Sequence, residues 1–334
     1  MNKFERAKLL SQSVFRAVLS RAFGIHRPVT ASWNITARCN LRCKHCGVYL
    51  NQPAELSTKD ALKLAEFLKA KGIPWVFISG GEPLLREDLG IIIEKLTSLG
   101  IGVGLSTNGL LIPSRLDMLK GVDKLIMSFD GPPEVHNHIR ADGAYEKLMK
   151  SIELLKGTDM TLHLTAVILK TNLEHFDFIL DKAEELGAIL SVQPGRINRI
   201  DSAEANTLAV TKEENQKIVD YLIKRKRGGY KNLFNSIEGL KHMREWPNPR
   251  PLPCVAGRMH FYISPGGYMR GCLNYPQVSP EQSKQNVCKD FEEEFSKIRP
   301  YTCRDCWCGE SIEYNLAYGL SFRSVVNLIK ENLI

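Results

Sequence analysis

Three cysteines stand close together near the start of the chain, Cys39, Cys43 and Cys46, in the spacing C-x3-C-x2-C. Thiolates bind iron–sulfur clusters and soft metal ions. Three thiolates on one loop can bind three irons of a cubic cluster, so the fourth iron has no cysteine ligand. An open position on a metal accepts a further small molecule, as catalytic zinc sites show. The alternative is a structural zinc site in which His45 completes the ligand set; the spacing favours the cluster.

A second group of cysteines lies in the last quarter of the chain. Cys254 and Cys272 flank two strand-like runs, Met259–Ile263 and Tyr268–Arg270, which predict a β-hairpin. Gly267 permits a tight turn between the two runs. We expect the hairpin to place Cys254 and Cys272 on adjacent strands.

The second group ends with Cys303, Cys306 and Cys308, in the spacing C-x2-C-x-C. We predict that one further cubic cluster is bound by Cys254, Cys272 and two of these three. Cys288 is predicted to be a spectator. A structural zinc site is the alternative, and in either case this region, which has little periodicity, needs its metal in order to fold.

Between residues 33 and 193, short apolar runs alternate with longer amphipathic ones, which predicts a repeated strand–helix unit. The six predicted strands are Trp33–Ala37, Trp75–Ser79, Gly102–Ser106, Lys124–Phe129, Leu162–Leu169 and Leu190–Gln193. The predicted helices between them are Thr58–Lys71, Glu87–Leu99, Pro113–Leu119, Ala144–Leu155 and Leu173–Leu186. Ser57 is expected to cap the first of these helices, with Asp60 in its first turn.

Six strand–helix units predict a parallel sheet, because each crossover returns the chain to the same edge. Six units are too few for a closed eight-fold barrel. We therefore expect an α/β fold, a partial (β/α)6 TIM-like barrel followed by a small C-terminal Cys-rich iron–sulfur domain. The loops at the carboxyl ends of the strands should form the active site, and the first cysteine group directly follows the first strand.

The stretch 39–46, Cys-Asn-Leu-Arg-Cys-Lys-His-Cys, resembles the signature of the radical S-adenosylmethionine (SAM) superfamily. Further matches follow at the ends of the next three predicted strands. They are Gly80-Gly81-Glu82-Pro83, Ser106-Thr107-Asn108-Gly109, and Ser128-Phe129-Asp130-Gly131 with His136 and Arg140 beyond it. The resemblance covers roughly residues 31–195.

This resemblance implies that Cys39, Cys43 and Cys46 hold a [4Fe-4S] cluster whose open iron binds the amino and carboxylate groups of SAM. It implies that Glu82 contacts the SAM amino group and that Arg140 contacts the carboxylate. The full set of SAM-binding residues that it implies is Gly80, Gly81, Glu82, Ser106, Asn108, Ser128, Asp130 and Arg140. The implied reaction is reductive cleavage of SAM to a 5′-deoxyadenosyl radical, which abstracts a hydrogen atom from an organic substrate.

The second cysteine group resembles the auxiliary-cluster region of the SPASM and twitch branches of that superfamily. The match is incomplete, because a full SPASM domain carries more cysteines after its last C-x2-C. The resemblance implies a second [4Fe-4S] cluster, which would assist a net oxidation or a bond-forming step. An electron donor such as flavodoxin or ferredoxin is implied as a partner.

Composition restricts the class of protein further. Of 334 residues, 43% are hydrophobic and 25% are charged, which is ordinary for a globular protein. The longest apolar runs are far shorter than a membrane span, and the N-terminal stretch does not have the form of a signal peptide. Nine cysteines in two groups point to metal binding rather than disulfides. We expect a cytoplasmic protein.

The N-terminal segment is basic, with six Lys or Arg and one acid in residues 1–27. Its apolar residues recur at helical spacing and predict one apolar helix face. This face contains Ala7, Leu10, Val14, Val18 and Ala22, with Phe4 and Phe15 beside it. We expect the face to pack on the end of the barrel; the alternative is peripheral contact with an anionic membrane.

The chain is predicted to divide into a basic helical segment (1–30), a partial barrel (31–199), a weakly helical connecting segment (200–250) and an auxiliary-cluster domain (251–334) with a closing helix from residue 314. The expected substrate is a small molecule: a lipid or isoprenoid, or a tetrapyrrole or other cofactor precursor. A ribosomal peptide is less expected, because only 38 residues precede Cys39. The rival from another class is a structural iron–sulfur or zinc protein that binds nucleic acid through Lys224–Arg227; we expect no nucleic acid partner.

Overall fold

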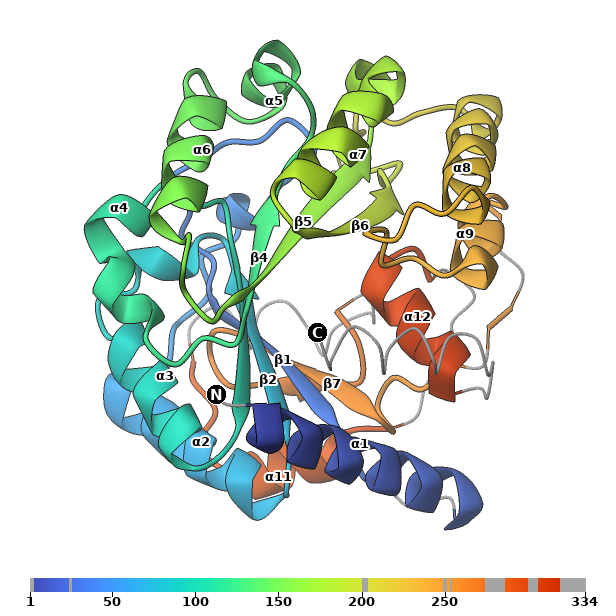
Figure 1. Cartoon of the computed structure of the whole chain (residues 1–334). Helices are drawn as coiled ribbons and strands as arrows, with labels where there is room; N and C mark the ends of the chain where they lie inside the picture. Colours follow the sequence, from blue (N-terminus) through green and yellow to red (C-terminus); the bar gives the residue numbers. More distant parts are fainter. Residues whose placement is uncertain are drawn as a thin grey trace.

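The computed structural model describes residues 3–23, 26–199, 204–248, 251–252, 254–273, 286–299 and 306–318. Six parallel strands form a curved sheet with helices on its outer side, so the predicted partial barrel is confirmed (Figure 1). These strands are β1 (Thr30–Thr36), β2 (Trp75–Gly80), β3 (Gly102–Thr107), β4 (Lys124–Ser128), β5 (Thr161–Ile168) and β6 (Ile189–Pro194). Each strand is hydrogen-bonded to the next along the chain.

The helices of these connections are α2 (Thr58–Ala70), α3 (Leu89–Ser98), α4 (Ile112–Arg115), α5 (Pro133–Ile139), α6 (Ala144–Leu154) and α7 (Phe176–Glu185). Four of them agree closely with the predicted ranges. The predicted helix Pro113–Leu119 is instead a four-residue helix followed by a 3-10 turn, and the helix at 133–139 was not predicted. Ser57 caps α2, because its side chain accepts a hydrogen bond from the backbone N–H of Asp60. Four 3-10 turns complete these connections: η1 (Val48–Leu50), η2 (Pro83–Leu85), η3 (Leu116–Leu119) and η4 (Lys170–His175).

The predicted hairpin is present as β7 (His260–Ile263) and β8 (Met269–Arg270), which pair antiparallel. Its turn is closed by a hydrogen bond from Gly267 N to Ser264 O, 2.9 Å. β7 also pairs in parallel with β1, so the hairpin extends the barrel sheet to eight strands. The expectation that Cys254 and Cys272 lie on adjacent strands was wrong, because both lie outside the short strands, at the open end of the hairpin.

Residues 212–243 are more ordered than the predicted weakly helical segment. They form α8 (Lys212–Arg227) and α9 (Ile237–Met243). Thr211 and Glu214 make a capping box at the start of α8, and its apolar side is buried. The basic run Lys224–Arg227 occupies the last turn of α8, where cations stabilise a helix end. Arg225 in that run pairs with Asp177 on α7.

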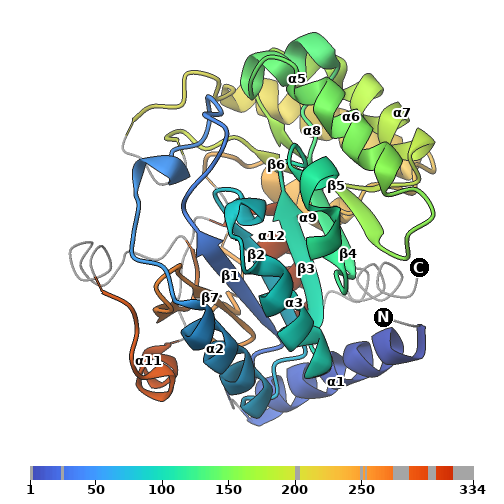
Figure 2. The ribbon, with the colours of Figure 1, turned by 90° about the vertical axis from the view of Figure 1, so that its left-hand side faces the viewer.

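The N-terminal helix α1 (Lys3–Phe23) lies across the amino-terminal end of the barrel (Figure 2). It packs through Leu9, Ala17 and Ser20, whereas Val14 and Val18 of the predicted apolar face are 44% and 58% exposed. The face expected to pack on the barrel is therefore the wrong one. Arg16 also holds α1 against the barrel, because its guanidinium donates hydrogen bonds to Pro28 O and Lys71 O, both at 3.0 Å.

None of the helices that the structure describes is long and apolar enough to cross a membrane.

Two C-terminal helices pack at opposite edges of the sheet. α11 (Phe291–Lys297) lies beside β8, and α12 (Gly309–Tyr318) packs against β6 and α9. The predicted closing helix from residue 314 overlaps the end of α12; its remainder, from residue 319, lies outside the described residues. α12 carries a buried acid, Glu313, whose Oε1 accepts a hydrogen bond from the Ser236 backbone N–H at 2.8 Å.

Burial raises the pKa of Glu313 to about 7. An acid whose pKa is raised on folding stabilises the fold below its unfolded pKa, and this stability is lost as the pH rises through the folded pKa. We expect the free energy of unfolding to fall by about 1–3 kcal/mol between pH 5 and pH 8. Glu313→Gln should remove this slope in denaturant titrations, and Glu153→Gln, an exposed acid on α6, should keep it. A Glu313→Gln slope equal to wild type would contradict the assignment.

Candidate functional site

The first cysteine group lies on the loop that follows β1, at the carboxyl edge of the sheet. Cys43 is buried, and Cys39 and Cys46 are half-buried. The backbone N–H of Leu41 lies 3.4 Å from Cys39 Sγ, and the N–H of Cys46 donates to Cys43 O at 3.1 Å. The three thiols therefore share one compact loop at the strand end where the fold predicts an active site.

Gly80 and Gly81 bring the end of β2 into direct backbone contact with the start of this loop. Gly81 N donates to Thr36 O and Glu82 N donates to Arg38 O, both at 2.8 Å. A Cβ on either glycine would overlap the backbone carbonyls of residues 36–38. Gly80 also has a φ of +146°, a backbone conformation that residues with a side chain rarely adopt. The two glycines are thus required by the close approach and not by a simple turn.

Glu82 is fully buried and ties the end of β2 to the end of β3. Its carboxylate accepts hydrogen bonds from Leu84 N (3.0 Å), Thr107 Oγ1 (2.8 Å) and Asn108 N (2.8 Å). Burial raises the pKa of Glu82, whereas these donors lower it. The Asn108 side chain continues the link, because its Nδ2 donates to Asn40 Oδ1 of the cysteine loop at 2.8 Å.

Arg140 connects the region after β4 to the same loop. Its Nε donates to Asp130 Oδ2 at 2.6 Å, and its Nη1 lies 3.7 Å from Cys43 Sγ. Both partners of the ion pair are almost completely buried. Burial alone would raise the pKa of Asp130, but the guanidinium charge outweighs it and holds that pKa below its usual range. Arg140 Nη2 makes no hydrogen bond with the described residues.

The remaining predicted pocket residues lie where the sequence placed them. Ser106 is the last residue but one of β3, and Ser128 is the last residue of β4. Both side chains are half-buried. His136 accepts a hydrogen bond from Asp130 N through its Nδ1 at 3.2 Å. The ends of β1 to β4 are thus joined to one another around the cysteine loop.

Sequence reasoning missed Arg199, which clamps the loop from the segment after β6. Its Nη2 donates to Cys46 O (2.6 Å) and to Tyr49 Oη (2.8 Å), and its Nη1 pairs with Glu204 (2.6 Å). The position just beyond the carboxyl end of β6 was the available signal, because loops at that edge form the site. No residue pattern distinguished it from a surface arginine.

The donor set fits an iron–sulfur cluster. Three thiols lie on one loop, and a guanidinium beside Cys43 offsets part of the negative charge that three thiolates bring. Burial raises the pKa of the Cys39 thiol to about 11, so this thiol stays protonated at neutral pH unless a metal displaces the proton. Among the described residues, no three Cys, His, Asp or Glu side chains are close enough to share a single metal ion.

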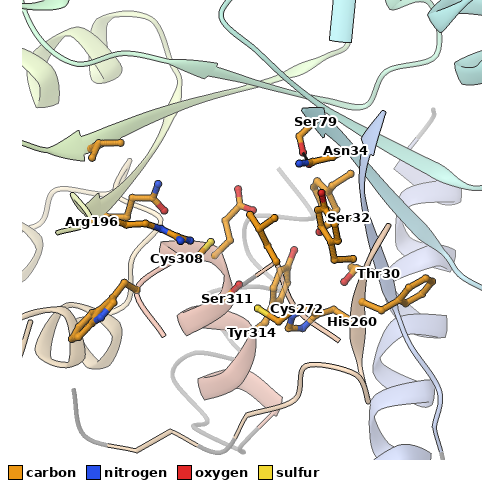
Figure 3. A pocket seen from close by; sticks show the side chains of 18 of the residues that line it. Thr30, Ser32, Asn34, Ser79, Arg196, His260, Cys272, Cys308, Ser311 and Tyr314 are labelled. Carbon is orange, nitrogen blue, oxygen red and sulfur yellow. Dashed lines mark hydrogen bonds between the residues drawn. The ribbon is translucent and has the colours of Figure 1, made fainter. Parts of the chain in front are cut away.

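The barrel interior contains a cavity of about 230 Å³. Figure 3 shows Cys272 and Cys308 of the second cysteine group among the side chains that line it. His45 of the first loop lines it, and so do Cys272 and Cys308. Short polar side chains line it from β1 and β2: Thr30, Ser32, Asn34 and Ser79. Charged groups reach it from the segment after β6 and from α12, namely Arg196 and Glu310.

The described members of the second cysteine group are Cys254, Cys272, Cys306 and Cys308; Cys303 lies outside the described residues. Asn315 on α12 links two parts of the group, because its Nδ2 lies 3.4 Å from Cys306 Sγ and its Oδ1 accepts from Val255 N at 3.0 Å. Cys308 directly precedes α12 and lies beside the charge of Arg196.

Cys288 lies elsewhere in the hairpin region. Its backbone N–H donates to Gly266 O at 2.8 Å, so it sits by the turn and away from the open end that Cys254 and Cys272 flank. The structure therefore separates Cys288 from Cys254 and Cys272, the described cysteines at the open end of the hairpin.

Comparison with known proteins agrees with this arrangement. Residues 33–183 match the model of the radical SAM superfamily. An AdoMet-dependent heme synthase of Oleidesulfovibrio alaskensis is 33% identical over 57% of this chain and 51% of its own length. The mycofactocin maturase MftC of Mycolicibacterium smegmatis is 28% identical over 78% of this chain and 68% of its own. The chain spans about half the length of the heme synthases that it matches.

The fold is also that of solved structures. Streptococcus suis SuiB bound to S-adenosylmethionine superposes with a TM-score of 0.62 over 83% of this chain and 67% of that chain. The sequence identity is 17%, so this likeness concerns the fold.

The glycine contact gives a direct test. In Gly81→Ala, the new Cβ would overlap the carbonyls of Ala37 and Arg38, so the loop must shift and the three thiols lose their arrangement. We expect anaerobically reconstituted Gly81→Ala to lose about four irons per chain. Gly90→Ala, on the exterior helix α3 where a Cβ meets only ordinary contacts, should keep the wild-type iron content. Wild-type iron in Gly81→Ala would show that the contact does not position the thiols.

Proposed function

Because residues 33–183 match the radical SAM superfamily model, we propose that the chain is an enzyme of this superfamily that cleaves SAM reductively and abstracts a hydrogen atom from an organic substrate in the barrel cavity. The observation that carries the proposal is the lining of this cavity, which includes His45 of the loop of Cys39, Cys43 and Cys46 as well as Cys272 and Cys308 of the second cysteine group. A substrate held there would lie between the two predicted clusters.

In this proposal, Cys39, Cys43 and Cys46 hold a [4Fe-4S] cluster with one iron open for SAM. When bound, the cluster and SAM supply the superfamily's chemistry, reductive formation of a 5′-deoxyadenosyl radical. The chain's own residues hold SAM in place. Arg140 Nη2 is available for the SAM carboxylate, since its other nitrogens engage Asp130 and Cys43.

The Glu82 carboxylate can accept a hydrogen bond from the SAM ammonium in addition to those that it accepts within the protein. A carboxylate has about four acceptor sites, and the structure uses three of them. An ammonium donor would satisfy the fourth and favour the ionised form. The remaining proposed SAM contacts line the same strand ends: Gly80, Gly81, Ser106, Asn108, Ser128 and Asp130.

The lining of the cavity is mixed, because Phe77, Phe261 and Trp307 lie in it beside the polar groups. This mixture favours a substrate with both apolar and polar parts over a purely apolar lipid or isoprenoid chain. Inward positions of a packed barrel strand usually carry bulky Val, Ile or Leu, whereas β1 presents Thr30, Ser32 and Asn34. A purely apolar chain offers no hydrogen bonds to the polar and charged groups of this lining, and burying such groups against it costs free energy. A cavity of about 230 Å³ also suits one arm of a larger molecule.

A tetrapyrrole or other cofactor precursor is therefore the substrate class that we favour, and the name of the matched heme synthase supports it. A peptide side chain is the second candidate, because the mycofactocin maturase aligns over the larger share of this chain. Both supply polar arms of a suitable size.

We propose that Cys254, Cys272 and two of Cys303, Cys306 and Cys308 bind a second [4Fe-4S] cluster. Cys272 and Cys308 lie in the cavity wall, so an electron left on the substrate after hydrogen abstraction would have a nearby acceptor. This arrangement suits a net oxidation or a bond-forming step. The rival, a structural protein that binds nucleic acid through Lys224–Arg227, is disfavoured by the pairing of Arg225 with Asp177 and of Lys226 with Leu233 O.

Substitution of the cysteines separates the two predicted clusters. The triple variant Cys39→Ala, Cys43→Ala, Cys46→Ala should lose about four irons per chain and all SAM cleavage. Cys272→Ala should lose iron from the second site but still cleave SAM, since Cys272 lies outside the first loop. Cys288→Ala is the matched control and should retain the wild-type iron content. SAM cleavage by the triple variant would refute the proposed function.

Arg140 allows SAM binding to be separated from cluster binding. Arg140→Gln should weaken SAM binding by about ten- to a hundredfold through loss of a charged hydrogen bond, with four irons retained at the first site. The double variant Asp130→Asn, Arg140→Gln avoids an unpaired buried carboxylate and should bind SAM as weakly. Calorimetry on the iron-loaded proteins measures the affinity, with Arg115→Gln as the surface control. Wild-type affinity in the double variant would show that Arg140 is only structural.

A further inference from the structure

The loop that carries the first three cysteines also presents a set of side chains to solvent. From residue 38 to residue 44, exposure alternates along the chain. Cys39, Leu41 and Cys43 are buried or half-buried, whereas the residues between and beside them are exposed. The exposed set is Arg38, Asn40, Arg42 and Lys44. The exposed side chains therefore face solvent beside the cysteines that would hold the proposed cluster.

This exposed side is positively charged. Residues 37–54 contain three Lys or Arg and no Asp or Glu. Arg38 is balanced by Glu55, whose two carboxylate oxygens both lie 3.1 Å from its guanidinium nitrogens. Arg42 and Lys44 form no ion pair with a carboxylate of the described residues. Two uncompensated cations thus flank Cys43 in the sequence.

Both cations make contacts within the chain that restrict their side chains. Arg42 Nη1 donates to Cys39 O (2.8 Å) and Leu41 O (2.9 Å), and its guanidinium carbon lies 4.4 Å from the centre of the Tyr49 ring. Lys44 Nζ lies 2.9 Å from Nε2 of His138 on α5. Cations that are already ordered lose little conformational entropy when a partner binds.

An apolar side chain completes the surface. Leu50, in the η1 turn of the same loop, is 50% exposed. A small apolar contact beside fixed charges is typical of weak encounter complexes, which bury less than about 1,200 Å².

We propose that Arg42 and Lys44 form the docking face for an acidic one-electron carrier protein that reduces the first cluster. This inference rests on the proposed function. The reduced carrier loses one electron and the cluster gains it, and no atom is transferred. Because the two cations lie next to Cys43 in the chain, a carrier attracted to them arrives beside a cluster ligand. Opposite charges over such a face accelerate association, and the effect falls as salt increases.

The test is the rate at which reduced flavodoxin, an acidic carrier, reduces the cluster of the iron-loaded protein, followed by loss of visible absorbance. We expect the wild-type rate to fall about tenfold from low salt to about 0.5 M salt. Lys44→Glu and Arg42→Gln should each slow the reaction severalfold at low salt. Lys120→Glu is the matched control, because Lys120 is exposed on the turn before β4, at the opposite end of the barrel, and its rate should equal wild type.

Three further measurements separate the outcomes. Iron content and the extent of reduction by excess dithionite should be equal in all variants, so that a slower rate reports docking. If dithionite reduces every variant but Lys44→Glu and Lys120→Glu react with flavodoxin alike, the docking face is refuted and the proposed function stands. If dithionite fails to reduce the wild-type cluster, the proposed function itself fails. Binding of phosphatidylglycerol vesicles through Lys44, with flavodoxin reduction unaffected, would assign the face to a membrane instead and overturn the proposal.

Discussion

Two backbone N–H groups, those of Gly81 and Glu82, donate to the carbonyls of Thr36 and Arg38 and so join the end of β2 to the start of the cysteine loop. No side chain fits between these backbones, so the loop is held against the sheet at main-chain distance. Glu82 also links the end of β2 to the end of β3, because its carboxylate accepts a hydrogen bond from Asn108 N. The arrangement of the thiols is therefore fixed by the sheet and not by the loop alone.

Side chains from distant segments complete the restraint on the loop. Asn108 holds Asn40, Arg140 approaches Cys43, and Arg199 holds the carbonyl of Cys46 from 153 residues away. A site that must hold a metal cluster needs its ligands prepositioned, and supporting residues do this work. In this chain each of the first three cysteines, or a residue beside it, has such a support.

The barrel interior serves the site in a different way. The inward residues of β1 are short and polar, so they leave space that bulky residues would fill in a packed barrel. The outward residues of the same strand, Ala31, Trp33 and Ile35, are fully buried under the helices and provide the hydrophobic core. Alternation along one strand thus separates the residues of the hydrophobic core from those that line the cavity. The strand that directly precedes the cysteine loop is also the one that opens the cavity.

Most of the barrel could be predicted from the sequence, because its strands and helices have strong periodicity and its motifs follow strand ends. α8 was underestimated, since its many charged residues conceal the buried stripe of Ile218, Val219 and Leu222. The buried face of α1 was mispredicted because Arg16 and Ser20 share the contact with Leu9 and Ala17, and a hydrophobic pattern does not mark the two polar residues. Arg199 and Arg196 were missed for a similar reason, as tertiary position alone distinguishes them from surface arginines.

The central claim is that the first cluster keeps one iron open and that SAM binds to this iron. The most direct test is electron–nuclear double resonance of the reduced protein with SAM labelled by ¹⁵N at its amino group. A hyperfine coupling between that nitrogen and the cluster is the result we expect, and Gly81→Ala should lack it. A reduced cluster whose spectrum is unchanged by saturating SAM, with no nitrogen coupling, would contradict an open iron on the loop of Cys39, Cys43 and Cys46.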